Sequence, residues 1–148
     1  MPSKAQIAYI DIRVFAHATE DADKVLIATC NILPKEVAET VNFKKTTLTG
    51  HYGNPIILFK TRIKEKDIAQ AVFEKISSEL SPLDKELLKS EIQQHLEKGS
   101  LYIRIDKQSA YSNELKLSSA DPIHLRIHFK KQNREEILEI CRRFGLLP

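Results

Sequence analysis

The sequence predicts an α+β fold in which helices pack on one face of a mainly antiparallel sheet, in the order β-α-β-β-α-α-β-β-α. Five stretches of the chain alternate apolar and polar residues with the period of two that is typical of half-buried strands. Four other stretches repeat apolar residues at helical spacing, and turn or capping residues separate the elements. Strands with one apolar and one polar face favour an antiparallel sheet that is covered on one side only.

The first strand is expected over residues 6–16, followed by a helix. Thr19 is the expected N-cap of that helix, and acidic residues in its first turn suit the positive end of the helix dipole. Pro34 is expected to end the helix. The apolar face of the first strand consists of Ala8, Ile10, Ile12, Val14 and Ala16.

Residues 39–49 and 56–64 are expected to form a hairpin, because both alternate and turn residues lie between them. The text Gly-His-Tyr-Gly at 50–53 matches the phosphate-clamping loop of KH domains, but that loop joins two helices, whereas this one joins strands. Turn geometry accounts for the glycines and for the following proline. It leaves His51, Tyr52 and Asn54 as candidates for hydrogen bonding to a ligand or stacking on it.

The second half of the chain continues the same pattern. Ser81 is the expected N-cap of one helix. The last helix is expected to begin after Asn133, which forms a capping box with Glu136, and to end before Gly145. The elements before that last helix are helices at 66–78 and 82–96, a strand at 100–106, a loop at 107–122 and a strand at 123–130.

A chain of 148 residues is long enough for one domain with its own core, and we expect a single domain over residues 1–148. Apolar residues make up 42% and charged residues 29% of the chain, which is typical of a globular protein. Apolar runs fall short of the roughly 18 residues that a membrane span needs. We therefore expect a cytoplasmic protein that has no membrane partner, with Cys30 and Cys141 as reduced thiols.

The outward positions of the strands carry a strong excess of positive charge, although the formal net charge of the chain is only +3. Asp11 and Asp106 are the acids on this face. Cations on one pleated surface repel each other, and a bound polyanion would relieve that repulsion. A simply solvated sheet face, or a protein partner with an acidic surface, would account for the same pattern. The outward basic and aromatic residues are Tyr9, Arg13, Lys60, Arg62, Lys64, Tyr102, Arg104, His124, Arg126, His128 and Lys130, with Lys44 or Lys45 depending on the register.

The sequence does not favour metal binding or catalysis. His124 and His128 are four residues apart, which on a strand separates them by roughly 13 Å, too far for one ion. Cys30 and Cys141 have no neighbouring histidine, and no nucleophile elbow, P-loop or dinucleotide fingerprint is present. We therefore expect no catalytic residue, no metal site and no cofactor.

Three fragments, at residues 15–34, 50–56 and 101–111, together with DPIHLRIHFK at 121–130, resemble the archaeal family of RNA-binding proteins and predicted exosome subunits. The resemblance covers nearly the whole chain in the right order. It implies a ribosomal protein L5-like α+β fold. It also implies a cytoplasmic role in RNA processing or translation.

These observations together predict a non-enzymatic RNA-binding protein that uses the basic sheet face and the loop at 50–56. The expected partners are single-stranded or structured RNA and exosome or ribosome-related proteins. The alternative is an interaction adaptor or a homodimerisation module that does not contact RNA directly. The predicted RNA-binding residues are Arg13, His51, Tyr52, Asn54, Lys60, Arg62, Tyr102, Arg104, Lys107, Tyr111, Arg126 and Lys130.

Overall fold

One antiparallel sheet organises the protein, whose structure is a computed structural model that describes residues 6–50, 52–130 and 133–148. The described strands run in the order β2-β3-β1-β6-β5-β4, and each pairs with its neighbours in antiparallel fashion. This confirms the predicted α+β class with a mainly antiparallel sheet, whereas the L5-like assignment stays a prediction. The strands are β1 (Ile7–Ala16), β2 (Lys44–Thr49), β3 (Pro55–Ile63), β4 (Leu96–Glu97), β5 (Ser100–Ile105) and β6 (Ile123–Phe129).

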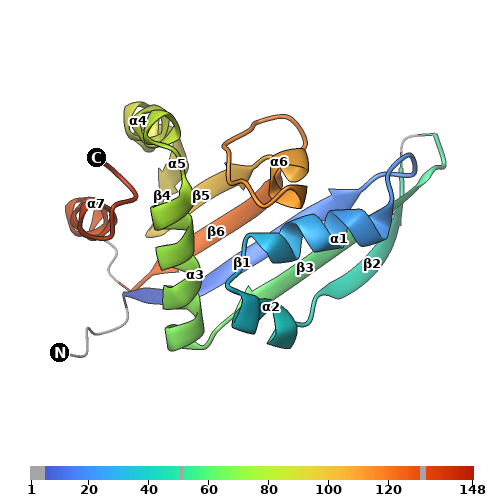
Figure 1. The fold of residues 1–148 in the computed structure, drawn as a ribbon, viewed down its shortest axis with the longest axis horizontal. Helices are drawn as coiled ribbons and strands as arrows, with labels where there is room; N and C mark the ends of the chain where they lie inside the picture. The colour runs from blue at the N-terminus through green and yellow to red at the C-terminus, as the bar shows by residue number, and fades with distance from the viewer. Residues whose placement is uncertain (1–5, 51, 131–132) are drawn as a thin grey trace.

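The helices form a layer on one face of the sheet, where α1 and α3 cross in front of the strands (Figure 1). Among the described residues, no helix has both the length and the apolar composition needed to cross a membrane. The helices are α1 (Ala22–Asn31), α2 (Lys35–Thr40), α3 (Lys66–Glu79), α4 (Pro82–Ser90), α5 (Ile92–His95), α6 (Lys107–Tyr111) and α7 (Arg134–Arg143).

The core lies between the sheet and this helix layer. Strand β6 shows the reason most clearly, because its residues alternate between buried and half-buried along their whole length. Its last apolar residue, Phe129, makes an edge contact with Phe73 of α3 at 5.7 Å between ring centroids. Phe73 in turn contacts Phe144, just after α7, at 5.5 Å, so one aromatic cluster joins the sheet to two helices.

Capping residues set the helix starts largely where the sequence predicts them. The Ser81 hydroxyl accepts a hydrogen bond from the backbone N–H of Asp84, and the Asn133 side chain accepts from the first turn of α7. The prediction of Thr19 as the first N-cap is wrong. The carboxylate of Asp21 caps α1 instead, because it accepts from the backbone N–H groups of the residues two and three positions later.

Three expected boundaries differ from the structure. The segment 39–49 begins in helix α2, which starts directly after Pro34, so strand β2 starts only at Lys44. The helix expected over 82–96 stops at Ser90, and its last residues form the short α5 and the edge strand β4. The loop expected over 107–122 contains α6, because the Asp106 carboxylate accepts from the backbone N–H of Ser109 and so caps a short helix.

A bulge shifts the alternation at the start of β1. The register of β1 against β6 changes between Ile7 and Tyr9, so Ile7 is fully buried while Ala8 is half-buried. The prediction of Ala8 on the buried face was therefore wrong by one position. From Ile10 onward the predicted alternation is confirmed.

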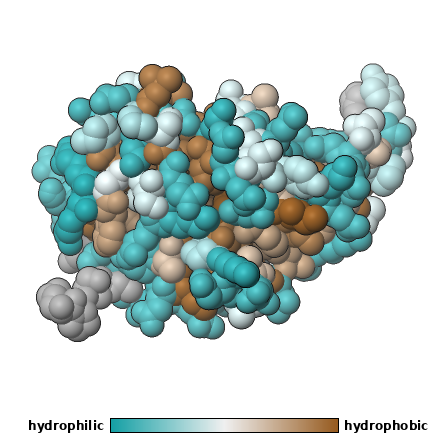
Figure 2. All heavy atoms as spheres, in the orientation of Figure 1, coloured by the Kyte–Doolittle hydropathy of each residue, from teal (hydrophilic) through white to brown (hydrophobic). Residues whose placement is uncertain are grey.

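The helix-covered side also exposes some apolar side chains. Figure 2 shows this side, with brown atoms over α4 and over α1 among mostly hydrophilic ones. Leu83 of α4 is 80% exposed, and Ile27 of α1 is 49% exposed. These side chains contribute little to the core.

We expect Ile127→Ala to lower the free energy of unfolding by about 2–5 kcal/mol. Ile127 is fully buried at the centre of β6, between β1 and β5, so its truncation leaves a cavity that the sheet cannot close. Leu83→Ala is the matched control and should change the free energy of unfolding by less than about 0.5 kcal/mol. Urea denaturation followed by circular dichroism measures both, and equal effects would contradict the placement of the core.

Candidate functional site

The face of the sheet opposite the helices is open, and the strand register arranges its side chains in rows. Directly opposite residues of antiparallel strands point to the same face, so cross-strand pairs extend into a row across the sheet. Lys44 pairs with Lys60, Lys60 with Arg13, Arg13 with His124, and His124 with Arg104. We call these five residues the cationic row. It crosses β2, β3, β1, β6 and β5 in turn, and at about 4.8 Å per strand it extends roughly 19 Å.

Positive charge in the cationic row is not neutralised by any carboxylate in the part of the chain that the structure describes. Its two lysines and two arginines are exposed, and no carboxylate among the described residues forms an ion pair with any of them. Like charges directly opposite each other on neighbouring strands are destabilising. The row therefore has an electrostatic cost in the free protein that a polyanion would remove.

The cationic row lies along a hollow in the open face with a volume of about 760 Å³. Six basic residues and one carboxylate line it, together with Tyr102 and His124. A concave surface with one sign of charge concentrates the field and attracts oppositely charged ligands. The basic lining residues are Arg13, Lys44, Lys60, Arg62, Arg104 and Arg126.

The next row along the strands behaves differently because it contains Asp11. Cross-strand pairs give the sequence Arg62, Asp11, Arg126 and Tyr102, which we call the paired row. Arg62 donates two hydrogen bonds to Asp11, from Nε to Oδ1 at 2.6 Å and from Nη2 to Oδ2 at 2.9 Å. This forked geometry is the strongest form of an arginine–carboxylate pair. Arg62 therefore already has an anionic partner, unlike the residues of the cationic row.

An aromatic cluster extends the paired row towards the start of β1. The guanidinium of Arg62 lies 4.2 Å from the centroid of the Tyr9 ring, which also stacks on the His128 ring at 4.8 Å. Ser100 Oγ is 2.8 Å from His128 Nδ1 and accepts a hydrogen bond from Arg126 Nε at 3.0 Å. These contacts hold Tyr9 and Arg126 in fixed positions.

Both histidines of the face have lowered pKa values. Burial is the largest cause of the lowered pKa of His124, followed by the charges of Arg13 and Arg104; Asp121 opposes the shift and Lys107 adds slightly to it. Burial likewise lowers the pKa of His128, with Arg126 and Arg62 next in importance. At neutral pH both imidazoles are therefore mainly uncharged.

Six of the predicted binding residues lie together on this face. The structure also resolves the alternative left open in β2, because Lys44 and not Lys45 pairs with Lys60 and lines the hollow. The strand period alone could not decide between the two. The predicted residues on the face are Arg13, Lys60, Arg62, Tyr102, Arg104 and Arg126.

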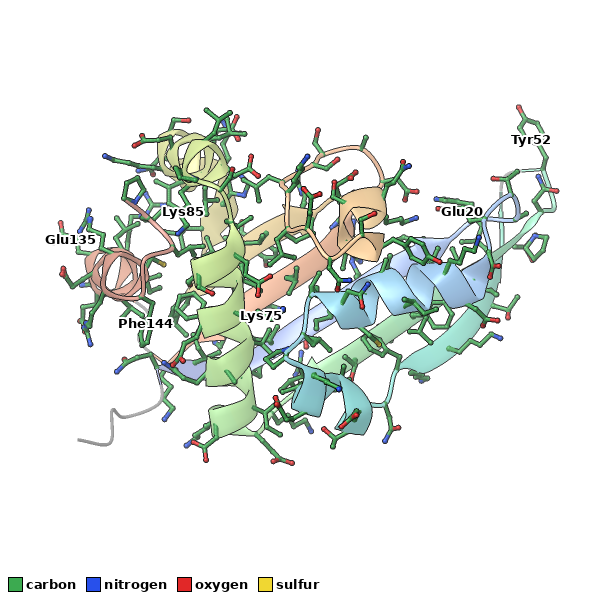
Figure 3. The ribbon with its side chains drawn as sticks, in the orientation of Figure 1. Glu20, Tyr52, Lys75, Lys85, Glu135 and Phe144 are labelled. Atoms are coloured by element: carbon green, nitrogen blue, oxygen red, sulfur yellow. The ribbon has the colours of Figure 1, made fainter. Side chains whose placement is uncertain are left out.

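The β2–β3 hairpin carries two more predicted residues, Tyr52 and Asn54, between its two strands, and Tyr52 lies at its far end (Figure 3). Tyr52 is 88% exposed. The Asn54 carbonyl accepts a hydrogen bond from the backbone N–H of Gly50 at 2.6 Å, which closes the turn. Gly53 has a φ of +78°, a conformation that glycine adopts without strain. His51, which was also predicted, lies outside the described residues.

Lys107 does not lie with the other cations, contrary to the prediction. Its ammonium donates to Glu20 Oε1 at 3.0 Å, to Asp121 Oδ2 at 2.7 Å and to the carbonyl oxygen of Phe15 at 2.6 Å. Its side chain is only 12% exposed. Lys107 therefore neutralises the carboxylates of Glu20 and Asp121 near the end of β1 and is not available to a phosphate.

Tyr111 and Lys130 are also displaced from the hollow. Tyr111 belongs to α6, which packs beside α1 in the helix layer, and its carbonyl accepts from the Asn31 side chain. It is 42% exposed on that side. Lys130 directly follows β6, and its backbone N–H donates to the carbonyl of Gln6 at the other end of the sheet from the hairpin.

His17, Glu20 and Asp121 have the composition of a metal-ligand set, and their ligand atoms lie within 4.8 Å of one another. The ammonium of Lys107 hydrogen bonds to both carboxylates, and His17 Nε2 is 3.1 Å from Asp121 Oδ1. Despite partial burial, which opposes the shift, these hydrogen bonds lower the pKa of Asp121. The chain itself thus supplies the positive charge that these carboxylates need.

The two cysteines are free thiols. Burial raises the pKa of both, and that of Cys141 to about 12. Only the thiolate is a strong nucleophile, so neither side chain is activated at neutral pH.

Comparison with known proteins adds to this picture. Residues 9–129 match the model of a family described as RNA binding. The RNA-binding protein PAB1135 of Pyrococcus abyssi is 36% identical over 147 residues, which cover 96% of each chain.

Two solved archaeal structures of the family DUF54 have the same fold. Protein AF2318 of Archaeoglobus fulgidus has a TM-score of 0.77 and 27% identity, covering 94% of this chain and 99% of its own. Protein SSO0741 of Sulfolobus solfataricus has a TM-score of 0.75 and 28% identity, covering 91% and 98%.

We expect Lys107→Met to lower the free energy of unfolding at pH 7 by about 1–3 kcal/mol, because it removes charge-assisted hydrogen bonds to Glu20 and Asp121. The pKa of Asp121 is lowered from its ordinary value of 3.8. Its ionised carboxylate therefore stabilises the folded state above that pH, and this stabilisation is lost as the pH falls below it. The difference between wild type and variant should therefore narrow below about pH 3.8. Lys116→Met, at a lysine side chain that is 60% exposed, is the control. Equal urea midpoints for the two variants would refute the structural role of Lys107.

Proposed function

This chain belongs to the RNA binding family, and from that premise we propose that it binds RNA through the cationic row without catalysing a reaction. The observation that carries the proposal is the alignment of Lys44, Lys60, Arg13 and Arg104 in one row, where no carboxylate of the described residues forms an ion pair with them. Each is exposed and lines the same hollow. Phosphate groups neutralise such cations and release their own counterions, which supplies most of the affinity of sequence-independent binding.

The neighbouring residues have supporting roles in this proposal. Arg62 is held by Asp11 and packs on Tyr9, so it shapes the edge of the hollow more than it neutralises phosphate. Arg126 is anchored by Ser100 and adds charge near Tyr102, whose ring lines the hollow and is available for stacking. Tyr52 and Asn54 lie on the hairpin and would contact RNA that extends beyond the row.

The cellular setting of this function is part of the proposal. The resemblance to predicted exosome subunits supports a place in RNA processing, and a role in translation is the second setting that it suggests. In either setting the protein would present its open face to RNA. Its helix layer would remain available to protein partners of the exosome or the ribosome.

The main rival is an adaptor or homodimerisation module that uses the same open face without RNA. The two functions respond differently to salt. Binding of RNA to the cationic row should weaken steeply as salt rises, whereas an apolar dimer contact should not. Sedimentation at two salt concentrations, with and without RNA, distinguishes these cases.

We expect Arg13→Gln/Arg104→Gln to weaken RNA binding at least about tenfold at moderate salt. Each removed cation should also reduce the slope of log affinity against log salt by about 0.7, hence by about 1.4 in total. Both side chains are exposed, so the fold should remain intact. Filter binding of a labelled RNA at four salt concentrations measures both quantities.

The matched control is Lys24→Gln/Lys89→Gln, which removes two exposed lysines from α1 and α4 in the helix layer. It lowers the net charge by the same amount and should leave affinity and slope nearly unchanged. If the control weakens binding as much as the variant of the row does, binding is governed by net charge alone and the proposal fails.

Acidification should tighten RNA binding about two- to tenfold between pH 7.5 and pH 5.5. Because its pKa lies below the ordinary 6.5, His124 is mainly neutral at pH 7.5 and gains a charge within the row as the pH falls. A bound phosphate favours the charged form, so protonation and binding reinforce each other. In His124→Gln this pH dependence should largely disappear, whereas His128→Gln should retain most of it. If the RNA affinity of wild type and His124→Gln changed identically with pH, protonation of His124 would not contribute to RNA binding.

A further inference from the structure

The cationic row has two different flanks on the open face. On the side of the β2–β3 hairpin, Leu58 pairs with Phe15 of β1, and Ile56 pairs with Leu48 of β2. We call these four residues the apolar strip. Phe15 lies two residues after Arg13 in β1, and Leu58 lies two residues before Lys60 in β3, so about 6.6 Å separates these two residues of the strip from the row.

The apolar strip does not belong to the core. Phe15 lies between Val14 and Ala16, which are both buried on the helix side, so its ring points to the open face. Leu58 likewise precedes the buried Phe59 and is only half-buried, and Leu48 is 41% exposed. These side chains form an accessible apolar surface directly beside an unneutralised row of cations.

The opposite flank of the cationic row is polar and already has internal partners. It is the paired row, in which Asp11 holds Arg62. Behind it, the Tyr9 ring packs against Arg62 and His128. On this flank the aromatic ring of Tyr9 is already occupied by contacts within the chain, whereas the side chains of the strip are apolar.

We propose that the apolar strip receives unpaired nucleobases of an RNA strand whose phosphates lie on the cationic row, so that the protein selects single-stranded over duplex RNA. This inference rests on the proposed function. A ribose links each phosphate to its base, so phosphates held on one row place the bases over the neighbouring row. Bases that are not paired expose flat apolar faces, which pack on aromatic and aliphatic side chains regardless of sequence.

Charge complementarity favours this occupant over a protein partner. An occupant of the strip must also lie against Lys60 and Arg13, whose charges have no carboxylate partner among the described residues. A nucleic-acid strand carries apolar and anionic groups at this short separation in every nucleotide. Four side chains are also far fewer than the roughly 20–30 residues that each side of a standard protein interface contributes.

The decisive experiment compares one 12-nucleotide RNA, single-stranded and annealed to its complement, with wild type and Phe15→Ala/Leu58→Ala. Wild type should bind the single strand more tightly. The double substitution should weaken single-strand binding about 5- to 30-fold and leave duplex binding and the salt slope nearly unchanged. Leu58→Phe keeps an apolar surface and should retain the preference.

Two further variants at exposed positions separate a loss of RNA contact from a folding defect. Leu48→Ser changes an exposed position of the edge strand and should weaken single-strand binding in the same direction, by less. Ile27→Ala truncates an exposed apolar side chain of α1 in the helix layer and should have no effect on either RNA.

Several outcomes would overturn the inference while leaving the proposed function intact. Equal affinity of wild type for single strand and duplex is one, and unchanged single-strand affinity in Phe15→Ala/Leu58→Ala is another, provided that Arg13→Gln/Arg104→Gln still weakens binding. Loss of self-association in the apolar variants without loss of RNA affinity would assign the strip to a protein contact. Failure of wild type to bind either RNA would remove the proposed function itself.

Discussion

The repulsion among side chains of the cationic row is the interaction on which the functional interpretation depends. Lys44 lies opposite Lys60, and Lys60 lies opposite Arg13, so like charges are neighbours on three consecutive strands. A sheet face that only needed to remain hydrated could place these cations beside carboxylates. The adjacent row shows such an arrangement, where Asp11 lies between Arg62 and Arg126. The two rows therefore differ in charge. Asp11 partly neutralises the arginines of the paired row, whereas the cations of the cationic row have no carboxylate partner among the described residues.

The helix layer makes this charge arrangement obligatory. Strands β1, β3, β5 and β6 each bury their other face, as in β6, where Leu125 is buried between His124 and Arg126. A shift in register by one residue in these strands would expose the core and bury charges, so burial of the core enforces the positions of Arg13, Lys60 and Arg104. The energy that holds the like charges together therefore comes from apolar packing on the far side of the same strands. A bound polyanion would relieve this repulsion.

The cluster around Lys107 illustrates the opposite use of charge. Its ammonium joins Glu20, next to the start of α1, to Asp121 in the loop before β6, and it also contacts the backbone at the end of β1. Residues 15–20 and the loop before β6 therefore meet at the Lys107 ammonium. Because Phe15 supplies the carbonyl in this cluster and a side chain of the apolar strip, the cluster also supports the edge of the open face.

The sequence by itself determined the α+β class, the alternation of the strands, the caps at Ser81 and Asn133, and a basic face that contains Arg13, Lys60 and Arg104. These properties follow from local periodicity and from hydrogen bonds within a few residues. Only the tertiary structure decided that Lys44 joins the row, that Arg62 is paired and that Lys107 is internal. A period of two tells which face a side chain occupies, but not which residue of a distant strand lies opposite to it. Charges separated by 51 or 87 positions in the chain become partners only when the register and the helix layer bring them within hydrogen-bond distance.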